Sequence, residues 1–228
     1  MVLRDQQRTV LSIALLAPAP SIGIASALIF FPGPIGQAIF TFCKLWLLAL
    51  PAFWWFVIEK RQIRWTGPSL KHLPVALGTG LFGSAAVVIA YFVIAAPRIN
   101  PEALRTTAVE IGIGSPAAYI AGALYWILVN SLIEEYVYRW FFMRQTLKIM
   151  TAVPAVLLSS AIFTLHHIIA LQAFLNWGFT SLASFGIFIG GATWCTIYYR
   201  VRSIWPCWIS HILIDIAVFA IGYIIIFG

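Results

Sequence analysis

Charged residues are scarce in this sequence. Only 9% of its 228 residues are Asp, Glu, Lys or Arg, and 62% are hydrophobic. A soluble domain has about 25% charged residues, because it must present a polar surface to water. The apolar residues form long unbroken runs rather than alternating segments of about ten residues, which excludes an outer-membrane barrel. The composition therefore indicates a helical membrane protein.

Cysteine is also scarce, and long polar stretches are missing. The three cysteines are odd in number, show no CxxC spacing and fall in apolar runs, which is typical of small buried side chains with free thiols. No stretch of about 50 residues has a soluble composition, and no repeat is evident. We therefore expect a single integral-membrane domain over residues 1–228. The net charge of +7 does not indicate a nucleic-acid partner, because membrane proteins gather positive residues in cytoplasmic loops.

Windows of about 20 apolar residues recur along the chain, and each is long enough to cross a bilayer as a helix. They predict an all-α, polytopic transmembrane bundle of about seven spans, with eight as the alternative. Lys and Arg gather before the first span and after the second, fourth and sixth, as in Lys60, Arg61 and Arg64. This pattern predicts a cytoplasmic N-terminus in the cell membrane. The expected spans are residues 10–31, 36–58, 74–96, 117–143, 153–171, 179–199 and 204–227.

Ionisable residues cluster inside three of these spans. Three of the seven acidic residues and three of the four histidines lie in the fourth, fifth and seventh spans. An ionisable group at bilayer depth costs at least about 2.5 kcal/mol, so such residues are functional candidates by default. The six residues are Glu134, Glu135, His166, His167, His211 and Asp215.

Spacing suggests different tasks for the two adjacent glutamates. Glu135 and Arg139 are four residues apart, on one helix face and in the order that favours an ion pair. Glu134 points about 100° away and is left to act as a general base. In the alternative interpretation both glutamates make structural ion pairs. Lys44, in the middle of the second span, is expected to extend toward the membrane surface, and contact with a carboxylate or a lipid headgroup is the alternative.

Two further pairs have helical spacing. Phe163 and His167 lie one turn apart in the fifth span, and His211 and Asp215 lie one turn apart in the seventh. A carboxylate one turn from a histidine can fix its tautomer, so that the other ring N–H could stabilise an oxyanion. Equally, the pair could tie the last helix into the bundle.

Together these pieces resemble the three motifs of the CPBP family, which includes CAAX-type prenyl-protein endopeptidases and bacteriocin-processing enzymes and consists of membrane glutamic proteases. The resemblance covers roughly residues 117–222, including the approach to the last motif at Ile204–Trp208. Its motifs match Glu134-Glu135-x-x-x-Arg139, Phe163-x-x-x-His167 and His211-x-x-x-Asp215.

The resemblance implies a role for each matching residue. Glu134 looks like the catalytic glutamate, with His167 as its partner in activating water. His211 with Asp215 looks like the oxyanion-stabilising pair, and Glu135 with Arg139 looks like the supporting ion pair. Many family members have Asn at the position of Asp215, and an ionised Asp cannot donate to an oxyanion, so Asp215 is expected to act through His211. The resemblance gives His166 no role.

The sequence thus predicts an intramembrane endopeptidase that needs no cofactor or metal. Its substrate would be a membrane-associated protein or peptide, such as one with a prenylated C-terminus or a membrane-embedded segment, and membrane lipid would surround it. The oligomeric state stays open. For His167 to reach the depth of Glu134, we expect the fourth span to continue toward Met150.

Three alternatives have a physical basis. A metalloprotease could use Glu134, Glu135, His167 and His211 as ligands, although HExxH and HxxEH are absent. A proton-coupled transporter could use the same acid–histidine chain. A scaffold or immunity protein could keep the cluster without its chemistry.

Overall fold

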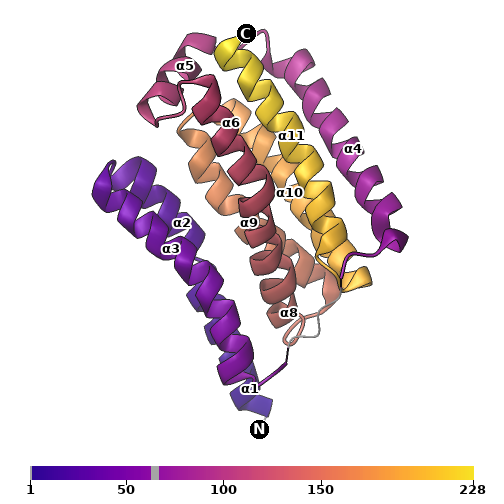
Figure 1. Ribbon diagram of the computed structural model, residues 1–228. Helices are drawn as coiled ribbons and strands as arrows, with labels where there is room; N and C mark the ends of the chain where they lie inside the picture. Colours follow the sequence, from indigo (N-terminus) through magenta and orange to yellow (C-terminus); the bar gives the residue numbers. More distant parts are fainter. Residues whose placement is uncertain (1, 63–66) are drawn as a thin grey trace. The chain divides into compact units, whose positions relative to one another are not determined.

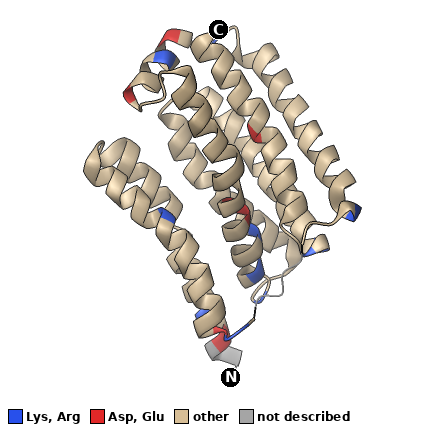
Figure 2. Cartoon of the chain, in the orientation of Figure 1, with Lys and Arg blue, Asp and Glu red and all other residues tan. Residues whose placement is uncertain are grey.

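A computed structural model describes residues 2–62 and 67–228, with the side chains of residues 2–4 also left aside. Within these ranges the chain forms helices and no strand (Figure 1). Arg64, counted above among the loop cations, lies outside the described residues. Most charged residues lie near helix ends (Figure 2).

Seven helices of the described chain are long and apolar enough to cross a membrane, which confirms the predicted all-α, multi-pass architecture with seven spans. Five of the seven begin earlier or end later than predicted by more than one residue. The spans are Asp5–Phe30, Pro34–Ile58, Leu70–Ala95, Pro116–Thr146, Ala152–Gln172, Trp177–Val201 and Trp205–Phe227.

Helix starts follow from local chemistry. Asn176 and Ser115 each precede a helix and accept a hydrogen bond from a backbone N–H of its first turn, through Oδ1 and Oγ respectively. Proline stands in the first turn of several helices, as at Pro34 and Pro116, where its missing N–H costs nothing. Arg202 ends α10 in a left-handed conformation with φ of 59°.

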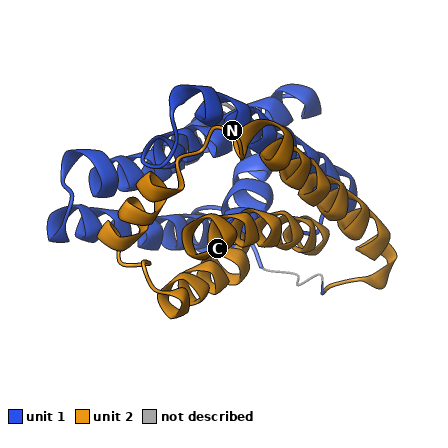
Figure 3. Ribbon diagram, turned by 90° about the horizontal axis from the view of Figure 1, so that it is seen from above, with its two compact units in different colours: residues 1–67, 133–204 blue, residues 68–132, 205–228 orange. Residues whose placement is uncertain are grey.

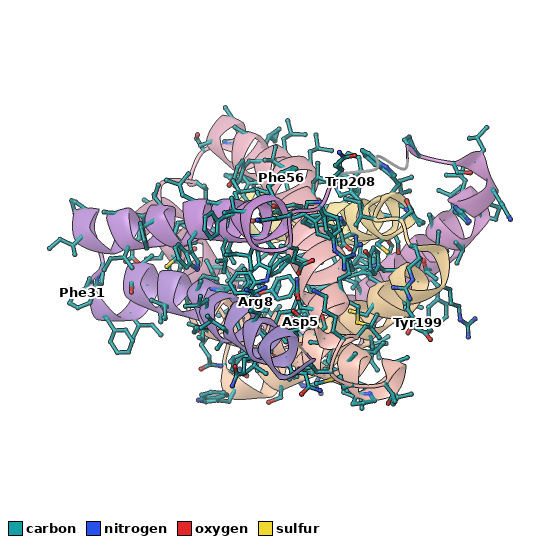
Figure 4. The ribbon with its side chains drawn as sticks, turned by 90° about the horizontal axis from the view of Figure 1, so that it is seen from below. Asp5, Arg8, Phe31, Phe56, Tyr199 and Trp208 are labelled. Atoms are coloured by element: carbon teal, nitrogen blue, oxygen red, sulfur yellow. The ribbon has the colours of Figure 1, made fainter. Side chains whose placement is uncertain are left out.

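The chain divides into two compact units, coloured separately in Figure 3. Unit 1 comprises residues 1–67 and 133–204. In it α2 packs on α3 and α9, and α9 packs on α10 and on η6, a segment of π-helical hydrogen bonding. Phe31, 52% exposed, lies at the turn that joins η1 to α3 (Figure 4). The helices are α1 (Val2–Leu16), α2 (Ala19–Ala25), η1 (Ser26–Phe30), α3 (Pro34–Phe53), η2 (Trp54–Ile58), η6 (Glu135–Phe142), α8 (Met143–Thr146), α9 (Ala152–Gln172) and α10 (Trp177–Val201).

Unit 2 comprises residues 68–132 and 205–228 and is centred on α11. Helix α11 packs along α4, and it also contacts α5, α6 and η5. The Tyr119 hydroxyl donates to the Phe219 carbonyl at 2.9 Å. The helices are η3 (Leu70–His72), α4 (Leu73–Ala90), η4 (Tyr91–Ala95), α5 (Pro101–Glu110), α6 (Pro116–Leu124), η5 (Tyr125–Asn130) and α11 (Trp205–Phe227), while α7 (Ser131–Glu134) crosses the boundary between the units.

Two features refine the predicted segment boundaries. The fourth span continues to Thr146, and turns follow it up to Met150, so the helix runs on part of the way that we expected. A short helix, α5, occupies what we expected to be a loop. Asn100 caps it by accepting from the backbone N–H of Glu102, and Pro101 opens it. The single domain predicted over residues 1–228 stays a prediction.

Candidate active site

Glu134, the last residue of α7, lies beside two histidines of α9. Its Oε1 is 3.6 Å from Nε2 of His166. One possible ligand atom from each of Glu134, His166 and His167 lies within 4.8 Å of the other two. Glu134 and His166 are buried, and His167 is half-buried. Within unit 1 the structure thus brings Glu134 and His167 together, as the motif argument required, and adds His166.

The His167 ring is oriented by its own helix. Its Nδ1 lies 2.9 Å from the Phe163 carbonyl oxygen, one turn earlier. Because a carbonyl oxygen only accepts, Nδ1 must carry the proton in this contact. In the neutral ring Nε2 then holds a lone pair, which is the state needed to accept a proton or a metal ion.

His166 is held by a tyrosine of η6. The Tyr138 hydroxyl lies 3.1 Å from His166 Nδ1, and the two rings are stacked with planes 7° apart. Tyr138 is 3% exposed and His166 5%. Tyr138 and Glu134 are four residues apart, and both line one pocket with His166. The same helix therefore contacts both nitrogens of the His166 ring.

Glu135 and Arg139 occupy a different side of the helix and form a fully buried ion pair. Arg139 Nε lies 3.3 Å from Glu135 Oε2, and both side chains are 0% exposed. The guanidinium also faces the rings of Phe163 at 4.5 Å and Trp194 at 5.0 Å. These contacts link η6 to α9 and α10, so the pair stands where a supporting role requires it.

A pocket lies beside Glu134 in unit 1. It is lined mainly by apolar residues of α2 and α3, including Ile24, Phe40 and Leu47, and by Glu134. Lys44 also lines it, near enough to Glu134 to interact electrostatically. Of the two expectations for Lys44, this placement near a carboxylate fits the alternative rather than extension toward the membrane surface. Its ammonium lies 5.5 Å from the Phe40 ring.

His211 and Asp215 lie in α11, in unit 2. His211 Nε2 is 3.6 Å from Asp215 Oδ1, so the two side chains meet as their spacing predicted. His211 is buried, and the Asp215 side chain is 21% exposed. The preceding residue, Ser210, is tied to α4 by a 3.0 Å hydrogen bond from Thr79. The pair thus sits on a helix whose position is fixed by its neighbour, and its chemical role stays a prediction.

The Glu134 cluster has the composition of a metal site. Two imidazoles and a carboxylate are a common ligand set for catalytic zinc, which usually takes three protein ligands and leaves a fourth position for water. Sequence reasoning named a different set, with Glu135 and His211. Glu135 pairs with Arg139 instead. Among the described residues, Glu134, His166 and His167 could hold a metal ion together.

Sequence reasoning missed Tyr138 in this region and gave His166 no role. The signals were present, since Tyr138 is four residues after Glu134 and His166 adjoins His167. They could not be used without knowing how the helices of unit 1 are rotated about their axes.

Comparison with known proteins gives one match. The family model described as type II CAAX prenyl endopeptidase Rce1-like matches residues 116–217, somewhat less than half of the chain. The matched segment contains all three motifs. No curated protein and no solved structure matches.

Proposed function

We propose that this chain hydrolyses a peptide bond of a membrane-associated protein by means of water activated by Glu134 and His167. Residues 116–217 match the Rce1-like type II CAAX prenyl endopeptidase family model, which is consistent with the CPBP family. The family supports an intramembrane endopeptidase in general. The observation that carries the finer proposal is the buried cluster of Glu134 with His166 and His167, whose ligand atoms lie within 4.8 Å of one another.

Each proton in the proposed reaction has a named donor and acceptor. Glu134 accepts a proton from the water, and His167 Nε2 accepts a hydrogen bond from the same water. The water oxygen bonds to the carbonyl carbon, and His211, oriented by Asp215, donates to the resulting oxyanion. The C–N bond then breaks, and Glu134 returns its proton to the leaving amine. No acyl-enzyme forms.

The substrate enters from the membrane in this proposal. The pocket beside Glu134 is lined mainly by apolar side chains, which suits a prenyl group or the apolar residues of a membrane-embedded segment. Lipid is the other partner, and the protein resides in the cell membrane with its N-terminus in the cytoplasm.

The test uses purified protein in lipid nanodiscs and an internally quenched farnesylated peptide ending in a CAAX sequence. Wild type should cleave it, and Glu134→Gln should lower kcat by at least about 100-fold at unchanged thermal stability. If this peptide is not cut, mass spectrometry of protein termini in cells with wild type or Glu134→Gln replaces it. Identical termini in both samples would overturn the proposal.

A metal-dependent hydrolase is the second candidate, because the same cluster offers three ligands. A bound zinc would polarise the carbonyl and lower the pKa of its water. Purified protein assayed after treatment with a strong chelator separates the two. Activity that is lost and then restored by zinc, with one zinc per chain by elemental analysis, favours the metal. Activity that persists favours Glu134 as the base.

A further inference from the structure

We infer that His166 is a positioning residue that holds Glu134, with its Nε2–H directed at the carboxylate and its Nδ1 bound by the Tyr138 hydroxyl. This inference rests on the proposed function and deepens it. The three side chains are buried and come from two membrane spans: Glu134 and Tyr138 from Pro116–Thr146, and His166 from α9. The two distances are 3.6 Å from Nε2 to Glu134 Oε1 and 3.1 Å from Nδ1 to the Tyr138 oxygen.

The proton positions follow from what each group can do. An ionised carboxylate only accepts, so the ring nitrogen that faces Glu134 is favourable only as a donor. With the proton on Nε2, Nδ1 has a lone pair, and the Tyr138 hydroxyl donates to it. The opposite tautomer would direct the Nε2 lone pair at the carboxylate, which is repulsive. Ionised Glu134 therefore selects one tautomer of His166.

The two adjacent histidines then have opposite tautomers. His167 carries its proton on Nδ1, because that atom faces the Phe163 carbonyl, and its Nε2 can accept. His166 carries its proton on Nε2 and donates. The His167 ring is thus prepared to accept a hydrogen bond from the water, while the His166 ring holds Glu134 in place. This difference separates the roles of two residues with the same side chain.

The arrangement restricts Glu134 because both ends of the His166 ring contact one helix. Glu134 and Tyr138 are four residues apart, and His166 on α9 reaches both. The stacked rings of Tyr138 and His166 prevent the imidazole from turning. Lys44 and His167 also lie near Glu134. A carboxylate held in one orientation loses less entropy when it meets its water.

Two amide substitutions at His166 test its two contacts separately. The amide of His166→Gln reaches the Nε2 position and can still donate to Glu134. The shorter amide of His166→Asn reaches only the Nδ1 position and can still accept from Tyr138. Positioning of Glu134 therefore predicts that Gln preserves activity and Asn does not. If the ring served only to pack against Tyr138, the order would be the reverse.

The kinetic experiment uses the nanodisc protein and the farnesylated peptide. We expect His166→Asn to lower kcat about 10- to 100-fold with KM changed less than about 2-fold, and His166→Gln to stay within about 5-fold of wild type. Tyr138→Phe should lie between them. His72→Gln, which changes the one histidine outside the three polar spans, is the control and should match wild type. Wild-type kcat in His166→Asn would overturn the inference.

A second readout does not need a substrate. Nitrogen-15 NMR of the histidine side chains, with His166 assigned by its loss in His166→Asn, should show a protonated Nε2 and an unprotonated Nδ1. In Tyr138→Phe the Nδ1 resonance should shift. A proton on Nδ1 of His166 in wild type would overturn the inference. If Glu134→Gln cleaves the peptide as fast as wild type, the proposed function fails. If Glu134→Gln is inactive but His166→Asn keeps wild-type kcat, only the inference about His166 fails.

Discussion

Arg139 shows how a charge is kept inside this protein. Its guanidinium has no exposed surface, lies 3.3 Å from Glu135 and faces the rings of Phe163 and Trp194. Removing one partner of a buried ion pair leaves an uncompensated charge and costs about 3–5 kcal/mol. The pair therefore matters for stability, in contrast to the catalytic role proposed for Glu134.

The difference can be measured in two variants. Arg139→Ala should lower the free energy of unfolding by about 3–5 kcal/mol, read from thermal or denaturant unfolding in detergent. Arg200→Ala, which removes an exposed arginine at the end of α10, should change it by less than about 0.5 kcal/mol. The double variant Glu135→Gln/Arg139→Met should regain part of the loss, because no charge is then left unpaired. If Arg139→Ala is as stable as wild type, the supporting role is wrong.

At the scale of the elements, Glu59 ties the end of η2 to the turn after α8. Its Oε1 accepts from Gln145 Nε2 at 2.6 Å and pairs with Lys148 Nζ at 2.5 Å. Partial burial opposes its ionisation, but the two hydrogen bonds and the charges of Lys148 and Arg61 outweigh burial. They lower the pKa of the Glu59 carboxyl below its ordinary value.

The pH dependence of stability follows from that direction. A lowered pKa means that the contribution of Glu59 is full above the unfolded value, about 4.3, and is lost as the pH falls through the folded value. The unfolding midpoint of wild type should thus fall on acidification below about pH 4.3 more steeply than that of Glu59→Gln. Glu102→Gln, whose carboxylate is 79% exposed, is the control. Parallel curves for wild type and Glu59→Gln would contradict the prediction.

Close packing of α4 on α11 depends on one glycine. A Cβ at Gly80 would lie 3.0 Å from Leu213 Cβ and 3.1 Å from the Ser210 backbone, whereas a Cβ at Gly78 would meet nothing within 4 Å. Small residues let helices approach closely in membranes. Gly80→Ala should therefore cost about 1–3 kcal/mol, from crowding that outweighs the gain in helix propensity. Gly78→Ala in the same helix should be neutral or stabilising by up to about 1 kcal/mol. Equal midpoints in thermal unfolding would show that α4 can move away freely.

The sequence predicted the spans and the contacts within single helices, but not the contacts between helices. Hydrophobic length alone located all seven spans, because a span needs about 20 apolar residues whatever it packs against. The short helix α5 was missed, since a ten-residue helix of mixed composition has no such length constraint and Asn100 is a weak signal by itself. Spacing within one helix also predicted the contacts Glu135–Arg139 and His211–Asp215. Contacts between helices, such as Tyr138 with His166, depend on helix rotation and could not be predicted.

At the scale of the whole molecule, the number of spans determines on which sides the ends lie. Seven crossings put the N-terminus and C-terminus on opposite sides, and eight put them on one side. The loops after the second, fourth and sixth spans carry Lys and Arg, whereas the loops after the first and fifth carry none. Positive residues near span ends stay in the cytoplasm, which predicts a cytoplasmic N-terminus and an external C-terminus.

Fusions to the two ends test this directly in bacterial cells. A fluorescent protein, which folds in the cytoplasm, should be bright at the N-terminus and dark at the C-terminus after Gly228. Alkaline phosphatase, which needs an oxidising compartment, should be active only at the C-terminus. Replacing Lys60 and Arg61 together by Gln removes cations that hold the second loop inside, and it should make the orientation mixed. The exposed residue Gln62, changed to Asn, is the neutral control. Fusions that report both ends on one side would require an even number of crossings. One of the seven apolar stretches would then not cross the membrane, or one more segment would cross it.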